Sequence, residues 1–198
     1  MNKGAHNVLT TLGTTNGSTK NRQKDDFYAT EPKATKMCLE ELKKHFTVSN
    51  WDVWEPAVGM GHISKVLEED GINVVKKSDL IDRGINADIE DFLTTSDMNN
   101  SNVIFTNPPY KLANSFLNHF FEIAKDGDLY IFLGRIQFLE GKERRKIFDE
   151  NPPKYVFVHS KRVSCWKDGI ETKDSNAIAY AWFVFEKGYN GDTIIKWL

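Results

Sequence analysis

The stretch of sequence that decides the fold is a short strand pattern ending in a glycine-rich turn, Trp51-Asp52-Val53-Trp54-Glu55-Pro56-Ala57-Val58-Gly59-Met60-Gly61. Directly after it, Ile63, Val66 and Leu67 recur at the spacing of a helix. The stretch therefore predicts a strand, a tight turn and a helix in succession. This unit is typical of sheets with parallel strands, in which ligands bind beyond the carboxyl ends of the strands.

Strand and helix patterns alternate along the rest of the chain. We expect strands at residues 51–55, 73 to about 80, 102–106, 129–133, 154–158 and 177–185, with a short extended edge piece at 193–197. Helices are expected at residues 33–46, from 63 onward, at 112–123 and at 135–149, the last interrupted near Gly141. This alternation predicts an α/β fold with a mostly parallel, twisted, Rossmann-like sheet and helices on both faces.

Three local features complete the expected secondary structure. Thr30 is a candidate cap of the first helix, with Pro32 in its first turn. Residues 88–93 indicate a loop or a single helical turn, and residues 160–175 a polar loop that carries Trp166. A second Asn-Pro-Pro, at Asn151, precedes a strand and is expected to stop a helix.

Length and composition limit the organisation of the chain. At 198 residues it is long enough for one domain with a substantial core, which we place at residues 26–198. Residues 1–25 are polar and are expected to form a flexible arm, either a disordered tail or a basic arm that follows phosphates. With 26 basic and 28 acidic residues, the chain lacks the general basicity of a protein that coats nucleic acid.

The cysteines and the hydropathy pattern indicate the compartment. Cys38 and Cys165 are too few for a disulfide framework, and neither has a metal-ligand spacing, so we expect no metal site. No apolar stretch approaches the length of a membrane span, and the N-terminus has no hydrophobic signal region. The sequence therefore predicts a reduced, cytoplasmic protein without a membrane partner.

The tetrapeptide Asn107-Pro108-Pro109-Tyr110 carries the strongest chemical signal. It follows the apolar run Val103-Ile104-Phe105, so it lies at the end of an expected strand. An amide acceptor, two stiff prolines and an aromatic face suit a flat ring that bears an amino group. A stiff turn after a strand is the alternative interpretation.

A second ligand is indicated by the glycine turn and the next strand end. Gly59 and Gly61 remove side chains where a backbone must approach a ligand, although the third glycine of the dinucleotide fingerprint is missing. Asp79, at the end of the following strand, can accept the hydrogens of both hydroxyl groups of a ribose. An ordinary tight turn with a solvated acid is the alternative.

These residues together resemble a known family. The order Phe27-Tyr28-x-Thr30-x-Pro32, Glu55-Pro56-x-x-Gly59-x-Gly61, Asp79, Asp91-Phe92-Leu93 and Asn107-Pro108-Pro109-Tyr110 resembles the S-adenosylmethionine-dependent amino methyltransferases. The resemblance is greatest to the small phage-type DNA adenine N6-methyltransferases and runs from about Asp26 to the C-terminus. It implies a single-domain class I methyltransferase fold, and host cytoplasm as the location if the chain is phage-encoded.

The resemblance implies a set of residues that bind S-adenosylmethionine. Glu55, Gly59 and Gly61 would surround its methionine part, with Thr30 near the carboxylate. Asp79 would hold the ribose, Asp91 the adenine amino group and Phe92 the adenine edge or face, and Asp88 competes with Asp91 for its role. The expected cofactor-binding set is Tyr28, Thr30, Glu55, Pro56, Gly59, Gly61, Asp79, Asp91, Phe92 and Asn107.

The expected catalytic residues are Asn107, Pro108, Pro109 and Tyr110. An exocyclic amino nitrogen is a poor nucleophile because its lone pair is delocalised into the ring. The Asn107 side-chain oxygen and the Pro108 carbonyl can accept its two hydrogens and oppose that delocalisation, while Tyr110 stacks on the ring. A target adenine in duplex DNA must be flipped out of the stack to reach them.

Substrate contacts are less well indicated. Trp166, with Lys161 and Arg162 nearby, is a candidate to stack on a base, or else a tucked tryptophan in a solvated loop. The basic run of residues 142–146 either meets phosphates or forms a charged helix face. His62 is interpreted as a helix-start residue rather than a catalytic base.

The sequence therefore predicts methyl transfer from S-adenosylmethionine to adenine N6 in DNA. The alternatives are methylation of an RNA base or of a protein glutamine amide by the same motif, and a non-catalytic module that binds cofactor or nucleic acid. No long insertion is present to read bases. We therefore expect a short target, relaxed specificity, or help from a second subunit such as a homodimer partner.

Overall fold

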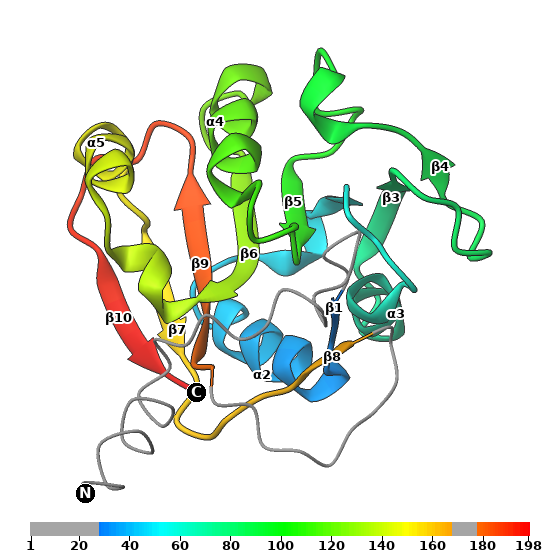
Figure 1. Ribbon diagram of the computed structural model, residues 1–198, viewed down its shortest axis with the longest axis horizontal. Coiled ribbons are helices and arrows are strands. Elements are labelled where there is room, and N and C mark those ends of the chain that lie inside the picture. The colour runs from blue at the N-terminus through cyan, green and yellow to red at the C-terminus, as the bar shows by residue number, and fades with distance from the viewer. Residues whose placement is uncertain (1–27, 168–177) are drawn as a thin grey trace, which may run out of the picture.

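The computed structural model describes residues 28–167 and 178–198 of the chain. The expected arm at residues 1–25 and residues 168–175 of the expected polar loop lie outside the described residues. In the described part, one sheet has the strand order β10-β7-β9-β6-β5-β2-β3-β4 (Figure 1). Its strands are β2 (Asp52–Glu55), β3 (Asn73–Asp79), β4 (Asp88–Ile89), β5 (Val103–Thr106), β6 (Leu129–Arg135), β7 (Tyr155–Val158), β9 (Tyr180–Glu186) and β10 (Ile194–Trp197).

The sheet is mostly parallel, as the sequence predicts. Only β9 runs antiparallel to its neighbours, β6 and β7, among the described strands of this sheet. From β2 the chain first adds β3 and β4 on one side and then returns to add β5 on the other. Strand order therefore reverses between β2 and β5, and the carboxyl ends of these two strands border a natural crevice for a ligand.

Helices cover both faces of the sheet (Figure 1). The helix α2 (Pro32–Leu42) packs with α3 (His62–Glu69) on one face. The other face is covered by α4 (Ala113–Ile123), the 3-10 turn η4 (Ile136–Leu139) and α5 (Lys142–Glu150). Two further 3-10 turns are η2 (Val48–Asn50) and η3 (Phe92–Thr94).

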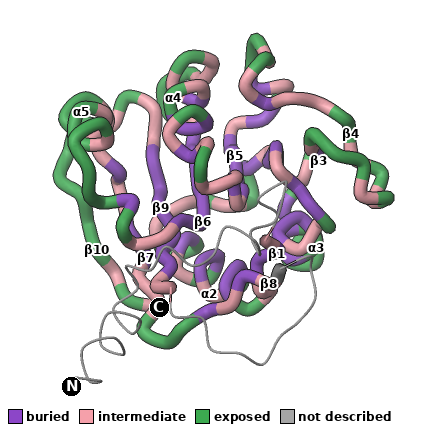
Figure 2. The backbone as a smooth tube through the Cα atoms, in the orientation of Figure 1, coloured by how far each residue is buried: buried purple, intermediate pink, exposed green. Residues whose placement is uncertain are grey.

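The central strand β6 explains why the core has two halves. Successive side chains of a strand point to opposite faces, so a strand between two helical layers is apolar throughout. Leu129, Ile131 and Leu133 join the cluster under α2 and α3, whereas Tyr130 and Phe132 join the cluster under α4. Figure 2 shows the buried residues concentrated along β6, β9 and β5, inside the shell of helices.

The start of the first helix differs from the prediction. Thr30 is not the cap; it is the last residue of a strand, β1 (Tyr28–Thr30), and the N-cap is Glu31. Pro32 occupies the first turn as predicted, since its missing N–H is not needed there. The α-helix ends at Leu42 rather than Phe46, and Met37 is only half-buried whereas Leu39 and Leu42 are in the core.

The expected polar loop after β7 was only partly correct. Residues Cys165–Lys167 form a strand, β8, which pairs antiparallel with β1. Trp166 therefore lies in a strand, opposite Ala29. Strand β9 begins at Tyr180, three residues later than the position expected. The pairing of β1 with β8 joins parts of the chain that are far apart in sequence.

The remaining local predictions are confirmed in part. Residues 88–93 were expected to be a loop or a single helical turn, but they contain the two-residue strand β4, followed by the start of the turn η3. The helix α5 ends at Glu150, with Asn151 as its C-cap, so the second Asn-Pro-Pro stops a helix. Among the described residues, no helix is long and apolar enough to span a membrane.

Candidate active site

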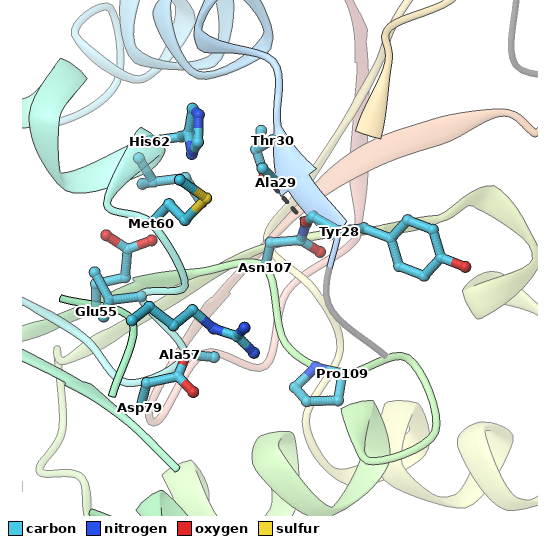
Figure 3. A pocket seen from close by; sticks show the side chains of 13 residues that line it. Tyr28, Ala29, Thr30, Glu55, Ala57, Met60, His62, Asp79, Asn107 and Pro109 are labelled. Atoms are coloured by element: carbon cyan, nitrogen blue, oxygen red, sulfur yellow. Dashed lines mark hydrogen bonds between the residues drawn. The ribbon is translucent and has the colours of Figure 1, made fainter. Parts of the chain in front are cut away.

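A cleft opens where β1 crosses the carboxyl ends of β2, β3 and β5 (Figure 3). Several of the predicted site residues meet there. The lining residues are Tyr28, Ala29, Thr30, Glu55, Ala57, Val58, Met60, His62, Ile63, Asp79, Arg83, Asn107 and Pro109. The reversal of strand order thus produces a cleft at the place that the topology predicts.

The floor of the cleft is shaped by the glycine turn after β2. Gly59 and Gly61 have φ values of 55° and 75°, a left-handed conformation that costs other residues energy. Gly61 is the N-cap of α3. The Gly59 N–H donates to Asp79 Oδ2 at 2.9 Å, so the acid at the end of β3 fixes the turn.

Asp79 is held in place by the backbone on both sides. Its Oδ1 accepts from the Ile81 N–H at 3.0 Å, in addition to the bond from Gly59 to its Oδ2. Each carboxylate oxygen has a second lone pair, so both oxygens remain able to accept from a ligand. Asp79 lines the cleft and points into it in Figure 3.

Glu55 is a buried acid at the end of β2. Its side chain is 2% exposed, and Oε2 accepts from the Ser64 N–H of α3 at 2.8 Å. Burial raises the pKa of Glu55 well above its ordinary value, against the smaller opposing effect of the bond from Ser64. A carboxyl in this state favours a cationic ligand, because a nearby positive charge would stabilise its ionised form.

The side-chain amide of Asn107 is oriented by β1. Its Nδ2 group donates to the Tyr28 carbonyl at 2.8 Å and to Thr30 Oγ1 at 3.1 Å. With both amide hydrogens used, the Oδ1 atom remains available as an acceptor at the cleft. The contact with Thr30 is drawn in Figure 3, where Asn107 lies between Glu55 and Asp79 on one side and the Tyr28 ring on the other.

Tyr110 lies on the far side of the tetrapeptide from the cleft. Its hydroxyl donates to Cys165 Sγ at 3.5 Å, and burial raises the pKa of Tyr110 well above its usual value. The Tyr28 and Tyr110 rings are 6.3 Å apart, with planes 21° from parallel. The two rings therefore lie in nearly parallel planes beside the tetrapeptide.

Some expected cofactor-binding residues lie outside the cleft lining. Phe92 is 1% exposed and packs in the core, with its ring 5.3 Å from Trp54 and 4.9 Å from Phe116. Asp91 caps the turn η3 by accepting from the Leu93 N–H at 3.0 Å. Asp88, its competitor, is an exposed residue of β4. Which acid meets an adenine ring therefore stays a prediction.

Pro56 and Pro108 are buried next to the lining residues rather than among them. Their role is to shape the backbone of the turns that carry Ala57 and Pro109 into the cleft.

The expected substrate-contact residues are separated by the structure. Trp166 packs edge-on against His62, with ring centroids 5.9 Å apart, so it supports the cleft through a lining residue. Lys161 and Arg162 are exposed in the loop between β7 and β8. They line neither this cleft nor a second pocket that lies beside Tyr110.

The sequence analysis missed several lining residues. Met60 and His62 flank Gly61 and could have been found from that position alone. Burial lowers the pKa of His62, and its Nδ1 atom is buried without a hydrogen-bond partner among the described residues. Arg83 enters from the irregular loop after β3, where no sequence pattern indicates which side chain turns inward.

Comparison with known proteins gives matches of structure only. No family model matches the chain, and no curated protein matches it. A candidate class I S-adenosylmethionine-dependent methyltransferase from Listeria monocytogenes superposes with a TM-score of 0.62 at 13% identity, covering 90% of this chain and 68% of that one. A candidate RNA methyltransferase from Pyrococcus horikoshii superposes with a TM-score of 0.59 at 15% identity, covering 81% of this chain and 87% of that one.

A type I restriction-modification methyltransferase subunit from Streptococcus thermophilus has a TM-score of 0.56 at 14% identity; the match covers 83% of this chain but only 45% of that one. At these identities the likeness concerns the fold, and it agrees with the alternating pattern of the sequence and with the strand order of the sheet. The chain has the Rossmann-like fold of the class I S-adenosylmethionine-dependent methyltransferases.

Proposed function

We propose that this chain transfers a methyl group from S-adenosylmethionine to the N6 amino group of adenine in DNA. The observation that carries the proposal is the state of the Asn107 amide. Both of its hydrogens are bound by Tyr28 and Thr30, at the border between a cleft and an aromatic slot. An oxygen acceptor held between these two sites is suited to an amino group that must meet a cofactor.

The cleft has the groups that the cofactor requires. S-adenosylmethionine supplies an electrophilic methyl group on a positively charged sulfonium sulfur. The Asp79 oxygens are suited to the ribose hydroxyls, and the left-handed turn at Gly59 and Gly61 brings the backbone close to a ligand. Glu55 contributes a buried carboxyl group, whose ionised form a positively charged ligand would stabilise.

The acceptor half of the site is formed by the tetrapeptide. Asn107 Oδ1 and the Pro108 carbonyl accept the two hydrogens of the amino group and localise its lone pair on nitrogen. Tyr110 stacks on the ring, and the nearly parallel Tyr28 ring lies beside it. Catalysis then rests on position and fixed dipoles, without a covalent nucleophile.

The test is transfer of a labelled methyl group to DNA, RNA and protein, with wild type and Asn107→Ala. We expect labelled N6-methyladenine in DNA, identified by mass spectrometry of the hydrolysed product. Loss of one well-placed polar group at a reacting centre typically costs about 100-fold in kcat, and we expect a loss of that order for Asn107→Ala. The matched control is Asn118→Ala, an exposed asparagine of α4, which should behave as wild type.

Three results would contradict the proposal. Label in protein alone, or in RNA alone, would favour the corresponding alternative. Full activity of Asn107→Ala would remove the amide from the mechanism. Cofactor binding without transfer to any of the three substrates would favour a non-catalytic binding module.

A further inference from the structure

A second pocket lies on the other side of the tetrapeptide. It is lined by Tyr110, whereas the cleft proposed for the cofactor is lined by Asn107 and Pro109. Its apolar floor is formed by Ala113, Phe132 and Phe138, and three cations surround it, Lys111, Arg135 and Arg144. No acidic side chain lines it among the described residues. Of its lining residues, the proposed reaction uses only Tyr110.

No ion pair between described residues neutralises the positive charge at this pocket. Lys111 is exposed, and neither Lys111 nor Arg135 forms an ion pair with another described residue. The Arg135 guanidinium lies 5.1 Å from the centre of the Tyr110 ring, and its Nε is buried without a hydrogen-bond partner in the described part of the chain. An anion that reached Arg135 would therefore meet a cation that is already positioned.

Arg144 is fixed on the opposite side of the pocket. Its Nε donates to the Glu140 carbonyl at 2.6 Å, and its Nη2 donates to the Gln137 carbonyl at 3.3 Å. The guanidinium also lies 5.1 Å from the centre of the Phe138 ring. The chain segment between β6 and α5 is therefore arranged around a cation above an aromatic floor.

The other basic residues of α5 are different. Arg145 donates to Asp149 at 2.6 Å, and Lys146 lies 3.7 Å from Glu143. Both are exposed and paired on their own helix. Of the basic run at residues 142–146, only Arg144 contributes to the pocket. Lys142 has no ion pair among the described residues, but it does not line the pocket; Arg144 is thus the cation of this helix that adds its charge to the pocket beside Tyr110.

We infer that this pocket binds the nucleotide that flanks the target base, on the same strand. The inference rests on the proposed function, because it needs a nucleobase held at Tyr110. A nucleotide joined to that base must lie beside it, with its phosphodiester near Arg135 and Lys111. Its sugar and base then cover the floor at Ala113 and Phe138. An acidic peptide would satisfy the cations but would leave the aromatic floor exposed, so a nucleotide matches the pocket better.

The test measures binding rather than methyl transfer. Probes are fluorescent single-stranded deoxyoligonucleotides with one adenine, in which either the linkages flanking that adenine or two distant linkages are replaced by neutral methylphosphonates. For wild type, we expect the flanking replacement to weaken binding about tenfold in fluorescence anisotropy, as for loss of a charged hydrogen bond, and the distant replacement to have a much smaller effect.

The variants Arg135→Gln and Lys111→Gln should each weaken binding of the natural oligonucleotide by about the same factor. On the probe with neutral flanking linkages, the variants should bind almost as tightly as wild type, because the contact between the cation and the phosphate is already absent. Lys111 is exposed, so its variant avoids the question of whether a change at Arg135 disturbs folding. Arg145→Gln, which removes an exposed paired cation, is the matched control and should bind as wild type.

If both pocket variants bind the natural oligonucleotide as tightly as wild type, the inference is overturned. It is also overturned if the variants weaken binding of the neutral probe as much as they weaken binding of the natural one. Tight binding of an acidic peptide that competes with the oligonucleotide, and that depends on Arg135, would overturn it in favour of a protein ligand. The outcome is separable from that of the proposed function. If wild type methylates DNA and the pocket variants bind normally, only this inference fails; if wild type transfers no methyl group, the binding cycle still decides the pocket.

Discussion

At the scale of single residues, the site depends on how one amide is oriented. An asparagine side chain can turn either its oxygen or its nitrogen toward a ligand, and only the oxygen accepts hydrogens from an amino group. Here the Tyr28 carbonyl and the Thr30 hydroxyl both bind the nitrogen side of Asn107. Thr30 is therefore a positioning residue for Asn107.

The prediction at Thr30 separates positioning from packing. Thr30→Val keeps the shape of the side chain but removes the acceptor for the amide, so we expect kcat to fall by about tenfold, since small misplacements of reacting groups are costly. Thr30→Ser, which keeps the hydroxyl, should retain most of the activity. Steady-state kinetics on DNA measure both, and an equal loss in the two variants would mean that the methyl group, not the hydrogen bond, is what matters.

Glu55 gives a prediction about pH. Burial raises its pKa in the folded protein above the ordinary value of 4.5, so the folded state binds the proton more tightly than the unfolded state. The resulting stability is fully present below pH 4.5 and is lost as the pH rises through the folded pKa. Without cofactor, the free energy of unfolding of Glu55→Gln minus that of wild type should therefore increase with pH above 4.5.

Urea unfolding at a series of pH values measures this difference for Glu55→Gln. The titration of all other groups cancels in the comparison with wild type, so parallel curves for the two proteins would contradict the prediction. Addition of cofactor should stabilise wild type more than the variant, because only the acid can compensate a positive charge.

At this scale, the sequence predicted a residue's place correctly where the residue is a glycine in a tight turn or lies at the end of a strand. Asp79 ends a strand and Asn107 follows one, and the structure brings both to one cleft. Gly59 and Gly61 do not line the cleft themselves, but they belong to the turn whose residues Ala57, Val58 and Met60 do. Arg83 could not be found in this way, because a long side chain in an irregular loop can point in many directions.

At the scale of elements, the last residues of β6 are tightly packed. Gly134 lies between Phe132 and Phe183, and a Cβ added there would lie 2.8 Å from Phe132 Cε2 and 3.1 Å from Phe183 Cε2. Both phenylalanines are fully buried, so neither ring can move away freely. A glycine is needed here for space rather than for backbone conformation.

Gly134→Ala should consequently destabilise the fold by about 1–3 kcal/mol, the usual cost of forcing an extra carbon into a packed core. The same change in a Phe132→Leu background should cost less, because the smaller side chain relieves the closest contact. Denaturant unfolding of the four proteins of this cycle measures the coupling. Additive effects in the cycle would be inconsistent with the clash.

The strands β1 and β8 show which elements a sequence does not reveal. Each is only three residues long, too short for a periodic pattern, and each has its partner far away in the chain. By contrast, the runs of β6 and β9 are apolar throughout and could be recognised directly. Thr30 was misplaced because a threonine two residues before a proline can cap a helix or end a strand, and its strand partner Cys165 lies far away in the chain.

At the scale of the whole molecule, the core contains no disulfide. Cys38 and Cys165 are both buried and free. Burial raises the pKa of Cys38 well above its usual value and that of Cys165 to about 11. Their thiols are therefore both inaccessible and protonated at neutral pH.

The native protein should react slowly with a thiol reagent at neutral pH, and rapidly at both cysteines once it is unfolded in urea. A reducing agent should leave the melting temperature unchanged. Fast labelling of the native protein at either cysteine would show that the face covering it opens readily.

The pairing of β1 with β8 has a consequence for the protein as it is made. The sheet strands β2, β3, β5 and β6 and the tetrapeptide are all complete before the ribosome reaches Cys165. Yet Tyr28 and Thr30, which set the amide of Asn107, are themselves paired with residues 165–167. A nascent chain can thus form much of the parallel sheet early, while the orientation of the Asn107 amide is fixed only when a late segment pairs with the first strand. Catalytic competence would be among the last properties that the chain acquires.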